Sequence, residues 1–136
     1  MRDKIINFIN KQNWNYLEKN NVIKIDIEGK SLSWTSYIKA DENDSFSFFS
    51  ILPAKADKEN LEDIAVFLHE INTKLWFGNF ELISKEPDIG QIRFRTSCYV
   101  PPMATDEVIE ALIGTTLNFN LATVDYYGKE ILSELL

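Results

Sequence analysis

Cysteine and histidine are nearly absent from this sequence. Its 136 residues include one cysteine, Cys98, and one histidine, His69. A single cysteine excludes an internal disulfide, and a reducing compartment fits that composition. A lone histidine, with no second histidine three or four residues away and no nearby cysteine, is a poor zinc ligand set. We therefore expect no metal and no cofactor, with Cys98 an inert buried thiol and His69 on a solvated helix surface.

Catalytic and nucleotide-binding signatures are missing as well. The sequence contains no G-x-G-x-x-G, no phosphate-binding loop and no G-x-S-x-G. The acidic stretch Asp41-Glu42-Asn43-Asp44 lacks the glycine and the distal glutamate of a calcium loop, which favours a solvated hairpin tip. These absences predict a protein that is not an enzyme. A cryptic enzyme that pairs Cys98 with His69 stays open as an alternative.

Long apolar runs are also lacking. No uninterrupted apolar stretch approaches the ~18–20 residues of a membrane-spanning helix. The opening residues Met1-Arg2-Asp3-Lys4 precede a mixed polar and apolar run rather than the apolar core of a signal peptide. We expect no membrane span and a cytoplasmic location.

Acidic residues outnumber basic ones. The net charge is −7, from 14 Lys and Arg against 21 Asp and Glu. Residues 1–24 carry five basic and two acidic side chains, so the negative charge belongs to the rest of the chain. An acidic body repels a phosphate backbone. The charge therefore argues against direct nucleic-acid binding and favours a protein or peptide partner.

Hydrophobic periodicity predicts eight elements in one domain, residues 1–136. Apolar residues spaced for a helix span Asp3–Asn20, a second helix runs from Asp57 to a stop at Gly78, and a third begins at a Thr105 cap. Alternating or continuous apolar patterns predict five strands, at 22–28, 31–39, 45–53, 79–86 and 89–100. The order α-β-β-β-α-β-β-α predicts the α+β class, with helices packed on an antiparallel five-stranded sheet.

Two features predict a homodimer. The third strand, with Phe46 and Phe48 on one side and Phe49 and Ile51 on the other, is apolar on both faces. The last helix carries an apolar stripe about 27 residues long, roughly 40 Å, whereas a typical strand spans only ~17–20 Å. The helix must therefore kink or overhang its sheet. An overhanging end needs a partner, and the candidate dimer contacts are Ile131, Leu132 and Leu135.

Two spaced motifs stand in the middle of the chain. The first runs from Asn72 through Gly78-Asn79-Phe80-Glu81, and the second is Gly90-Gln91-Ile92-Arg93-Phe94-Arg95-Thr96. Together with Phe48–Pro53 and Ala122–Tyr127, they resemble the YbjN family, which is classed as bacterial sensory-transduction regulators. The resemblance spans roughly residues 45–132. Trp76-Phe77 and Gly128 depart from the family pattern.

The resemblance implies the fold of type III secretion chaperones, which are small, acidic, often dimeric proteins that bind extended client segments. It implies a non-enzymatic regulator or chaperone-like protein with a protein or peptide partner. An antitoxin or immunity-type inhibitor with one toxic partner is the alternative. The candidate binding or family-motif positions are Asn72, Gly78, Asn79, Phe80, Glu81, Arg93, Arg95 and Thr96.

Three of these positions also carry an expectation from the strand pattern. Arg93 and Arg95 share one face of a strand, and Glu81 lies on the preceding strand. Cross-strand pairing of the arginines with Glu81 is expected. The arginines then form either a surface ion pair of small energetic value or a basic patch that suits an acidic peptide.

Overall fold

The computed structural model describes residues 1–41 and 44–135, and the side chain of Lys85 is outside the description. Glu42 and Asn43, in the expected hairpin tip, and Leu136, at the expected apolar end of the chain, lie outside the described residues. The described elements run α-β-β-β-β-α-β-β-α. They are α1 (Arg2–Lys11), β1 (Tyr16–Lys19), β2 (Val22–Glu28), β3 (Ser33–Ala40), β4 (Ser45–Ala56), α2 (Leu61–Asn72), β5 (Asn79–Glu86), β6 (Ile89–Tyr99) and α3 (Asp106–Glu134).

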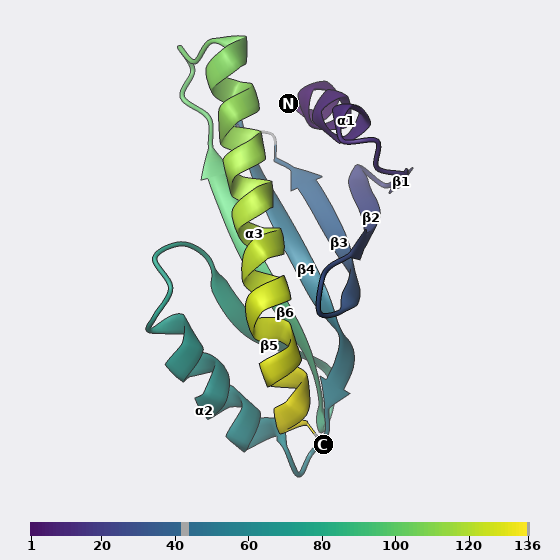
Figure 1. Ribbon diagram of the computed structural model, residues 1–136, viewed down its shortest axis with the longest axis vertical. Helices are drawn as coiled ribbons and strands as arrows, with labels where there is room; N and C mark the ends of the chain where they lie inside the picture. The colour runs from purple at the N-terminus through teal and green to yellow at the C-terminus, as the bar shows by residue number, and fades with distance from the viewer. Residues whose placement is uncertain (42–43, 136) are drawn as a thin grey trace.

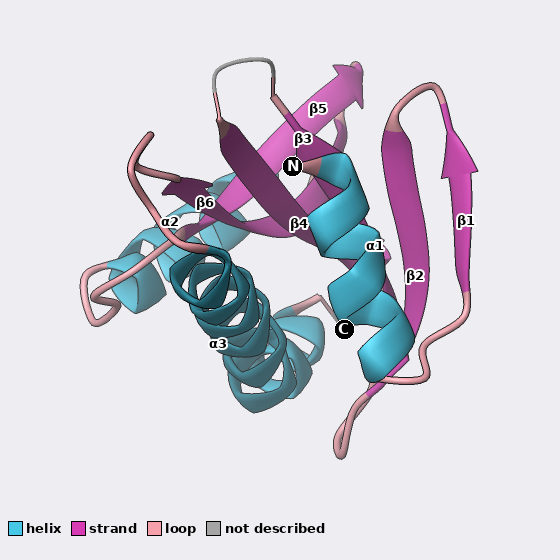
Figure 2. Cartoon of the chain, turned by 90° about the horizontal axis from the view of Figure 1, so that it is seen from above, coloured by secondary structure: helices cyan, strands magenta, loops and turns pink. Residues whose placement is uncertain are grey.

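The strands form one antiparallel sheet in the order β1-β2-β3-β4-β6-β5. All three helices lie on the same side of it (Figures 1 and 2), with α3 along the centre, α1 toward the β1–β2 end and α2 toward β5. The predicted α+β class, with helices on an antiparallel sheet, is confirmed. The third predicted strand, β4, is central, between β3 and β6.

The sheet has six strands, and the prediction of five was wrong. Residues 16–19, which the pattern assigned to the first helix, form β1 instead, because α1 ends at Lys11 and Asn13 turns the chain with a φ of 58°. Asn20 and Asn21 both take positive φ, 53° and 64°. Two consecutive left-handed residues are characteristic of a tight hairpin, which folds β1 back onto β2.

The long last helix is continuous over 29 residues, and it extends past the strands at its start, beside α1, rather than at its end as expected (Figure 1). Its start is as expected, because the Thr105 side chain accepts a hydrogen bond from Val108 N. The strands beneath it are long: β4 has 12 residues and β6 has 11. At about 3.3 Å per residue, β4 reaches roughly 40 Å, about twice the length of a typical strand, and so lies beneath the later part of the helix. Ile113, Leu117 and Ile131 are accordingly inaccessible to solvent.

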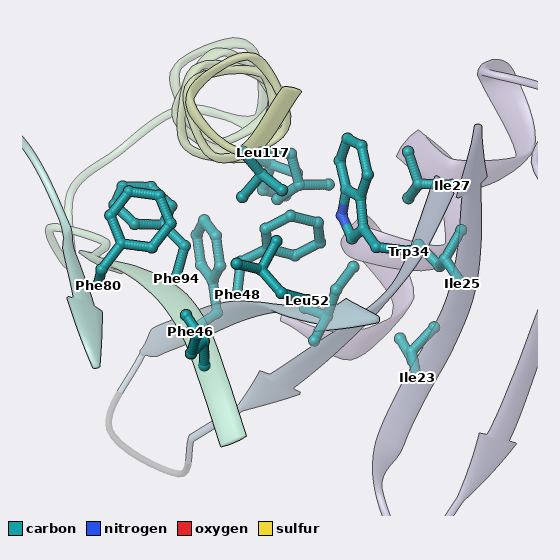
Figure 3. Close-up of a cluster of buried hydrophobic side chains, with 14 of the residues drawn as sticks. Ile23, Ile25, Ile27, Trp34, Phe46, Phe48, Leu52, Phe80, Phe94 and Leu117 are labelled. Carbon is teal, nitrogen blue, oxygen red and sulfur yellow. The ribbon is translucent and has the colours of Figure 1, made fainter. Parts of the chain in front are cut away.

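The core fills the layer between the helices and the sheet. Alternate residues of each central strand point into it, and the largest buried side chains include Phe46, Phe48 and Phe94 (Figure 3). Leu68 of α2 is buried with them. Within residues 1–41 and 44–135, no helix lies over the opposite side of the sheet, so the same strands present a second, open face (Figure 2). We refer to this surface as the open face.

Candidate functional site

Asn72 ties the end of α2 to strand β5. Its side-chain Nδ2 donates to Phe80 O at 3.0 Å, and Phe80 N donates to Asn72 Oδ1 at 2.7 Å. A primary amide that accepts and donates in this way takes the place of a neighbouring strand. Asn72 therefore closes the outer edge of β5 at one position, which makes its role structural.

Gly78 lies where β5 approaches β6. Its φ of 76° is left-handed, as expected, but α2 ends at Asn72, so Gly78 precedes a strand rather than ending a helix. A Cβ placed there would lie 2.7 Å from Arg95 O and 2.8 Å from the ring of Phe94. Both the conformation and the space at Gly78 favour glycine.

Two further motif residues belong to the core. Phe80 is buried, with its ring centroid 4.6 Å from that of Phe94, and Thr96 is buried beneath α3. The side chain of Asn79 is part-buried and reaches Glu81 at 3.4 Å. Most of the motif that resembles the YbjN family therefore builds the junction of α2, β5 and β6.

The predicted cross-strand ion pairing of Glu81 is confirmed. Its carboxylate contacts Arg93 Nη2 at 2.7 Å and Arg95 Nε at 2.9 Å. Glu81 is the most buried of the three ion-paired residues, with 15% of its side chain exposed, against 28% for Arg93 and 45% for Arg95. One carboxylate thus serves two guanidinium groups, so one positive charge stays unneutralised. Arg93 also lies over the ring of Phe49, 4.6 Å from its centroid.

The strand register gathers aromatic and cationic residues across the middle of the open face. Lys24 is opposite Tyr37, Tyr37 is opposite Phe49, and Phe49 is opposite Arg95. These four residues, which we name the cation–aromatic row, cross β2, β3, β4 and β6. Lys24 and Arg95 are exposed, and the two aromatic side chains are half-buried. The sequence did not reveal this row, because it depends on four strands in a particular register.

A buried polar network lies on the opposite side of the same strands. Asn120 of α3 donates to Phe48 O, Phe94 O and Thr96 Oγ1 at 3.1, 3.2 and 3.2 Å, and it accepts from Ser50 Oγ at 2.6 Å. Trp34 Nε1 donates to Ser50 Oγ at 3.0 Å. Among the described residues, no buried side-chain polar atom lacks a partner. The network fixes where α3 sits along the sheet. The sequence signal for it was an asparagine on an otherwise apolar helix face.

Cys98 and His69 lie in separate parts of the molecule. Cys98 is part-buried near the end of β6, which leads to the start of α3, whereas His69 is exposed on α2, beside β5 and the later part of α3 (Figure 1). In the described part of the chain, no group of three or more His, Cys, Asp or Glu residues could hold a metal ion. None of its helices is long and apolar enough to cross a membrane.

The candidate dimer contacts do not form an exposed patch. Ile131 is fully buried in the chain's own core, and Leu132 and Leu135 are part-buried against it. The long strands that shelter α3 explain the difference from the expectation. The stripe of α3 therefore no longer supports an interface between two copies.

Asp125 of α3 anchors the β2–β3 hairpin. Its carboxylate accepts hydrogen bonds from Lys30 N at 2.9 Å and Ser31 N at 3.0 Å. These bonds, that of Ser31 first, hold the pKa of Asp125 below its usual value. An open groove of about 750 Å³ lies beside this contact, with Trp14 and Glu28 in its lining. These hydrogen bonds give Asp125 a structural role, because they hold the β2–β3 hairpin against α3.

Comparison with known proteins supports the fold. No family model matches the chain, and no protein of curated function matches its sequence. Among solved structures, YbjN, described as "a putative transcription regulator from E. coli", aligns with a TM-score of 0.70 over 94% of this chain and 91% of that one. The two sequences are 12% identical, so the likeness concerns the fold. The chain has a YbjN-like α+β fold.

Proposed function

We propose that this chain is a non-catalytic, cytoplasmic regulator or chaperone-like protein, which acts by binding a protein or peptide partner on the open face of its sheet. One observation carries the proposal: the cation–aromatic row and the half-buried Ile51 beside it lie on a face that none of the described helices covers. Apolar side chains at the centre of a face, ringed by polar groups, are typical of protein interaction surfaces.

The edges of the sheet are less suited to a partner than its face. Strand β1 has only four residues. Strand β5 is closed at Phe80 by Asn72, and its pairing with β6 is irregular between Ile83 and Glu86. Short edges and irregular pairing discourage the addition of another strand. A partner therefore docks on the face rather than as a seventh strand.

The homodimer expected from the sequence stays a prediction with less support. The apolar end of α3 does not support it, because Ile131 is buried in the core of its own chain. Sedimentation equilibrium at micromolar concentration measures the assembly, and a mass of 15.7 kDa identifies a single chain.

The proposal is tested by affinity purification of the tagged chain from cells that contain its natural partners. We expect a partner at near-stoichiometric amounts with the parent protein. The double variant Tyr37→Ala/Phe49→Ala removes the aromatic pair and should lose that partner. Tyr126→Ala is the matched control, because Tyr126 is an exposed aromatic residue on α3, on the helix side of the molecule.

Three outcomes decide the proposal. Loss of the partner by the double variant but not by Tyr126→Ala supports it. Retention of the partner by both variants, or no partner at all with the parent, contradicts it. When the double variant loses its partners as expected, the number of different partners that the parent protein captures distinguishes the two functions. Several clients indicate a chaperone-like protein, and a single toxic partner indicates an immunity-type inhibitor.

A further inference from the structure

We infer that the occupant of the open face is an extended acidic segment of another protein, with carboxylates that bind Lys24 and Arg95 and an apolar side chain that packs on Tyr37 and Phe49. This inference rests on the proposed function, since it names the chemistry of the partner at the same surface. The register, charge and packing of the open face support it.

The row has the spacing of an extended peptide. Lys24, Tyr37, Phe49 and Arg95 occupy four adjacent strands, so the two cations are separated by three strand spacings, roughly 14 Å. Residues four apart in an extended chain are separated by about 13 Å. A segment that crosses the strands can thus place acidic residues at positions i and i+4 over the cations. The side chain at i+2 then faces the aromatic pair.

Charge complementarity selects an acidic segment. A second row lies next to it on the open face, toward the β1–β2 turn, and runs from Lys19 through Val22 and Lys39 to Ser47. This row adds two cations, Lys19 and Lys39. The described positions of these two rows carry four cations and no carboxylate. The only carboxylate bonded into them is that of Glu81, which Arg95 shares with Arg93. This basic area stands on a chain of net charge −7, so it is a local site for negative charge.

Nucleic acid fits the row less well than a peptide. Single-stranded nucleic acid stacks successive bases on a series of aromatic rings, whereas this row offers two, and the guanidinium of Arg93 lies 4.6 Å from the centroid of one of them, Phe49. The net charge of −7 also opposes a polyanion that extends past the basic rows. A short acidic segment makes its contacts within the rows.

A second copy of the chain fits poorly for another reason. A two-fold symmetric contact places the same surface on both partners, so a pair built on this row would bring Lys24 and Arg95 against cations of the same row. Like charges across an interface are unfavourable. The occupant is therefore a different chain.

The test is a fluorescence anisotropy titration with the full chain and two short labelled peptides. The acidic probe carries the core Glu-Ser-Leu-Ser-Glu, and the neutral probe carries Gln-Ser-Leu-Ser-Gln. The variant Lys24→Gln/Arg95→Gln removes both cations of the row. The matched control, Lys58→Gln/Lys129→Gln, removes two exposed lysines, one before α2 and one on α3. Lys24→Gln alone provides a variant at an exposed site should the double variant fold poorly.

We expect the acidic probe to bind the parent and the control equally, and the row variant about tenfold more weakly, a change of roughly 1.4 kcal/mol. Binding should also weaken as NaCl rises from ~0.05 to ~0.5 M, because salt screens exposed charges. Equal binding of both probes, or equal binding to the row variant, would overturn the acidic chemistry. The proposed function would survive that result if Tyr37→Ala/Phe49→Ala still loses its partner.

The same kinds of measurement would detect two other occupants of the open face, a nucleic acid and a second copy of the chain. A single-stranded oligonucleotide that binds where the acidic peptide does not would identify a nucleic-acid surface and overturn the inference. Sedimentation that shows a dimer of the parent and a monomer of the row variant would identify a second copy, which also overturns it.

Discussion

Asn72 pairs with the main chain of Phe80 through both polar atoms of its side-chain amide: Nδ2 donates to Phe80 O at 3.0 Å, and Oδ1 accepts from Phe80 N at 2.7 Å. The pair joins the last residue of α2 to the free edge of β5. Replacing Asn72 by alanine leaves the Phe80 N–H and C=O without those partners. We expect Asn72→Ala to lower the free energy of unfolding by roughly 1–3 kcal/mol, the cost of unsatisfied polar groups.

Urea denaturation measures that loss, and Asn79→Ala is its matched control. Asn79 lies on the same strand, and its side chain reaches only Glu81, at 3.4 Å. We expect the control to change stability by less than about 0.5 kcal/mol, as for most half-exposed positions. Equal losses in the two variants would show that the contact of Asn72 with β5 contributes nothing.

Gly78 should resist substitution for a backbone reason. Its φ of 76° disfavours a Cβ, and the nearest atom to that Cβ, Arg95 O at 2.7 Å, belongs to the main chain and cannot move aside. We expect Gly78→Ala to cost about 1–3 kcal/mol in urea melts. A variant as stable as the parent would contradict the left-handed conformation of Gly78.

Asn120 should be the polar residue on which the core depends most. Asn120→Ala removes one acceptor for Ser50 and the donors to the buried oxygens of Phe48 and Phe94. We expect a loss of roughly 2–4 kcal/mol in the free energy of unfolding. Asn118→Ala, exposed two residues earlier on α3, should change stability by less than about 0.5 kcal/mol. Comparable effects at the two positions would contradict the role of the network.

The ionised carboxylate of Asp125 should contribute to the free energy of unfolding, and acid should remove that contribution. Its pKa is lowered in the folded state, so the unfolded chain takes up the proton first as the pH falls. The stability that Asp125 contributes is therefore complete above the unfolded pKa of about 3.9 and declines as the pH falls through the folded pKa. The stability difference between the parent and Asp125→Asn should shrink below about pH 4. A difference that stays constant from neutral pH into acid would contradict the anchoring contacts.

The periodicity of the sequence was sufficient to locate the helices and the long strands, but not the ends of the first two helices. The stripe that contains Ile113, Leu117 and Ile131 predicted α3, and the shared face of Arg93 and Arg95 predicted their pairing with Glu81. These features depend on local spacing, or on two strands joined by a short turn. They can therefore be inferred without knowing the rest of the fold.

The short first strand and the cation–aromatic row could not be predicted in the same way. Residues 16–19 continue a helical pattern and become a strand only because β2 is there to pair with them. The row depends on the register of β4 with β6, which α2 and β5 separate in the chain. Ile131 was misassigned because strand length was taken as typical, whereas β4 extends to Ala56 with an irregularity between Ile51 and Lys55.

The most direct test of the binding surface is an NMR titration of the isotope-labelled full chain with the acidic Glu-Ser-Leu-Ser-Glu probe. If the probe binds on the open face, the chemical-shift changes at saturation should concentrate on the amides of the cation–aromatic row, Lys24, Tyr37, Phe49 and Arg95, and on the residues next to them on that face. Amides on the exposed sides of α2 and α3 should stay unchanged. Changes confined to those helices would contradict the open face as the binding surface, and a spectrum that does not respond to the probe would contradict the acidic occupant.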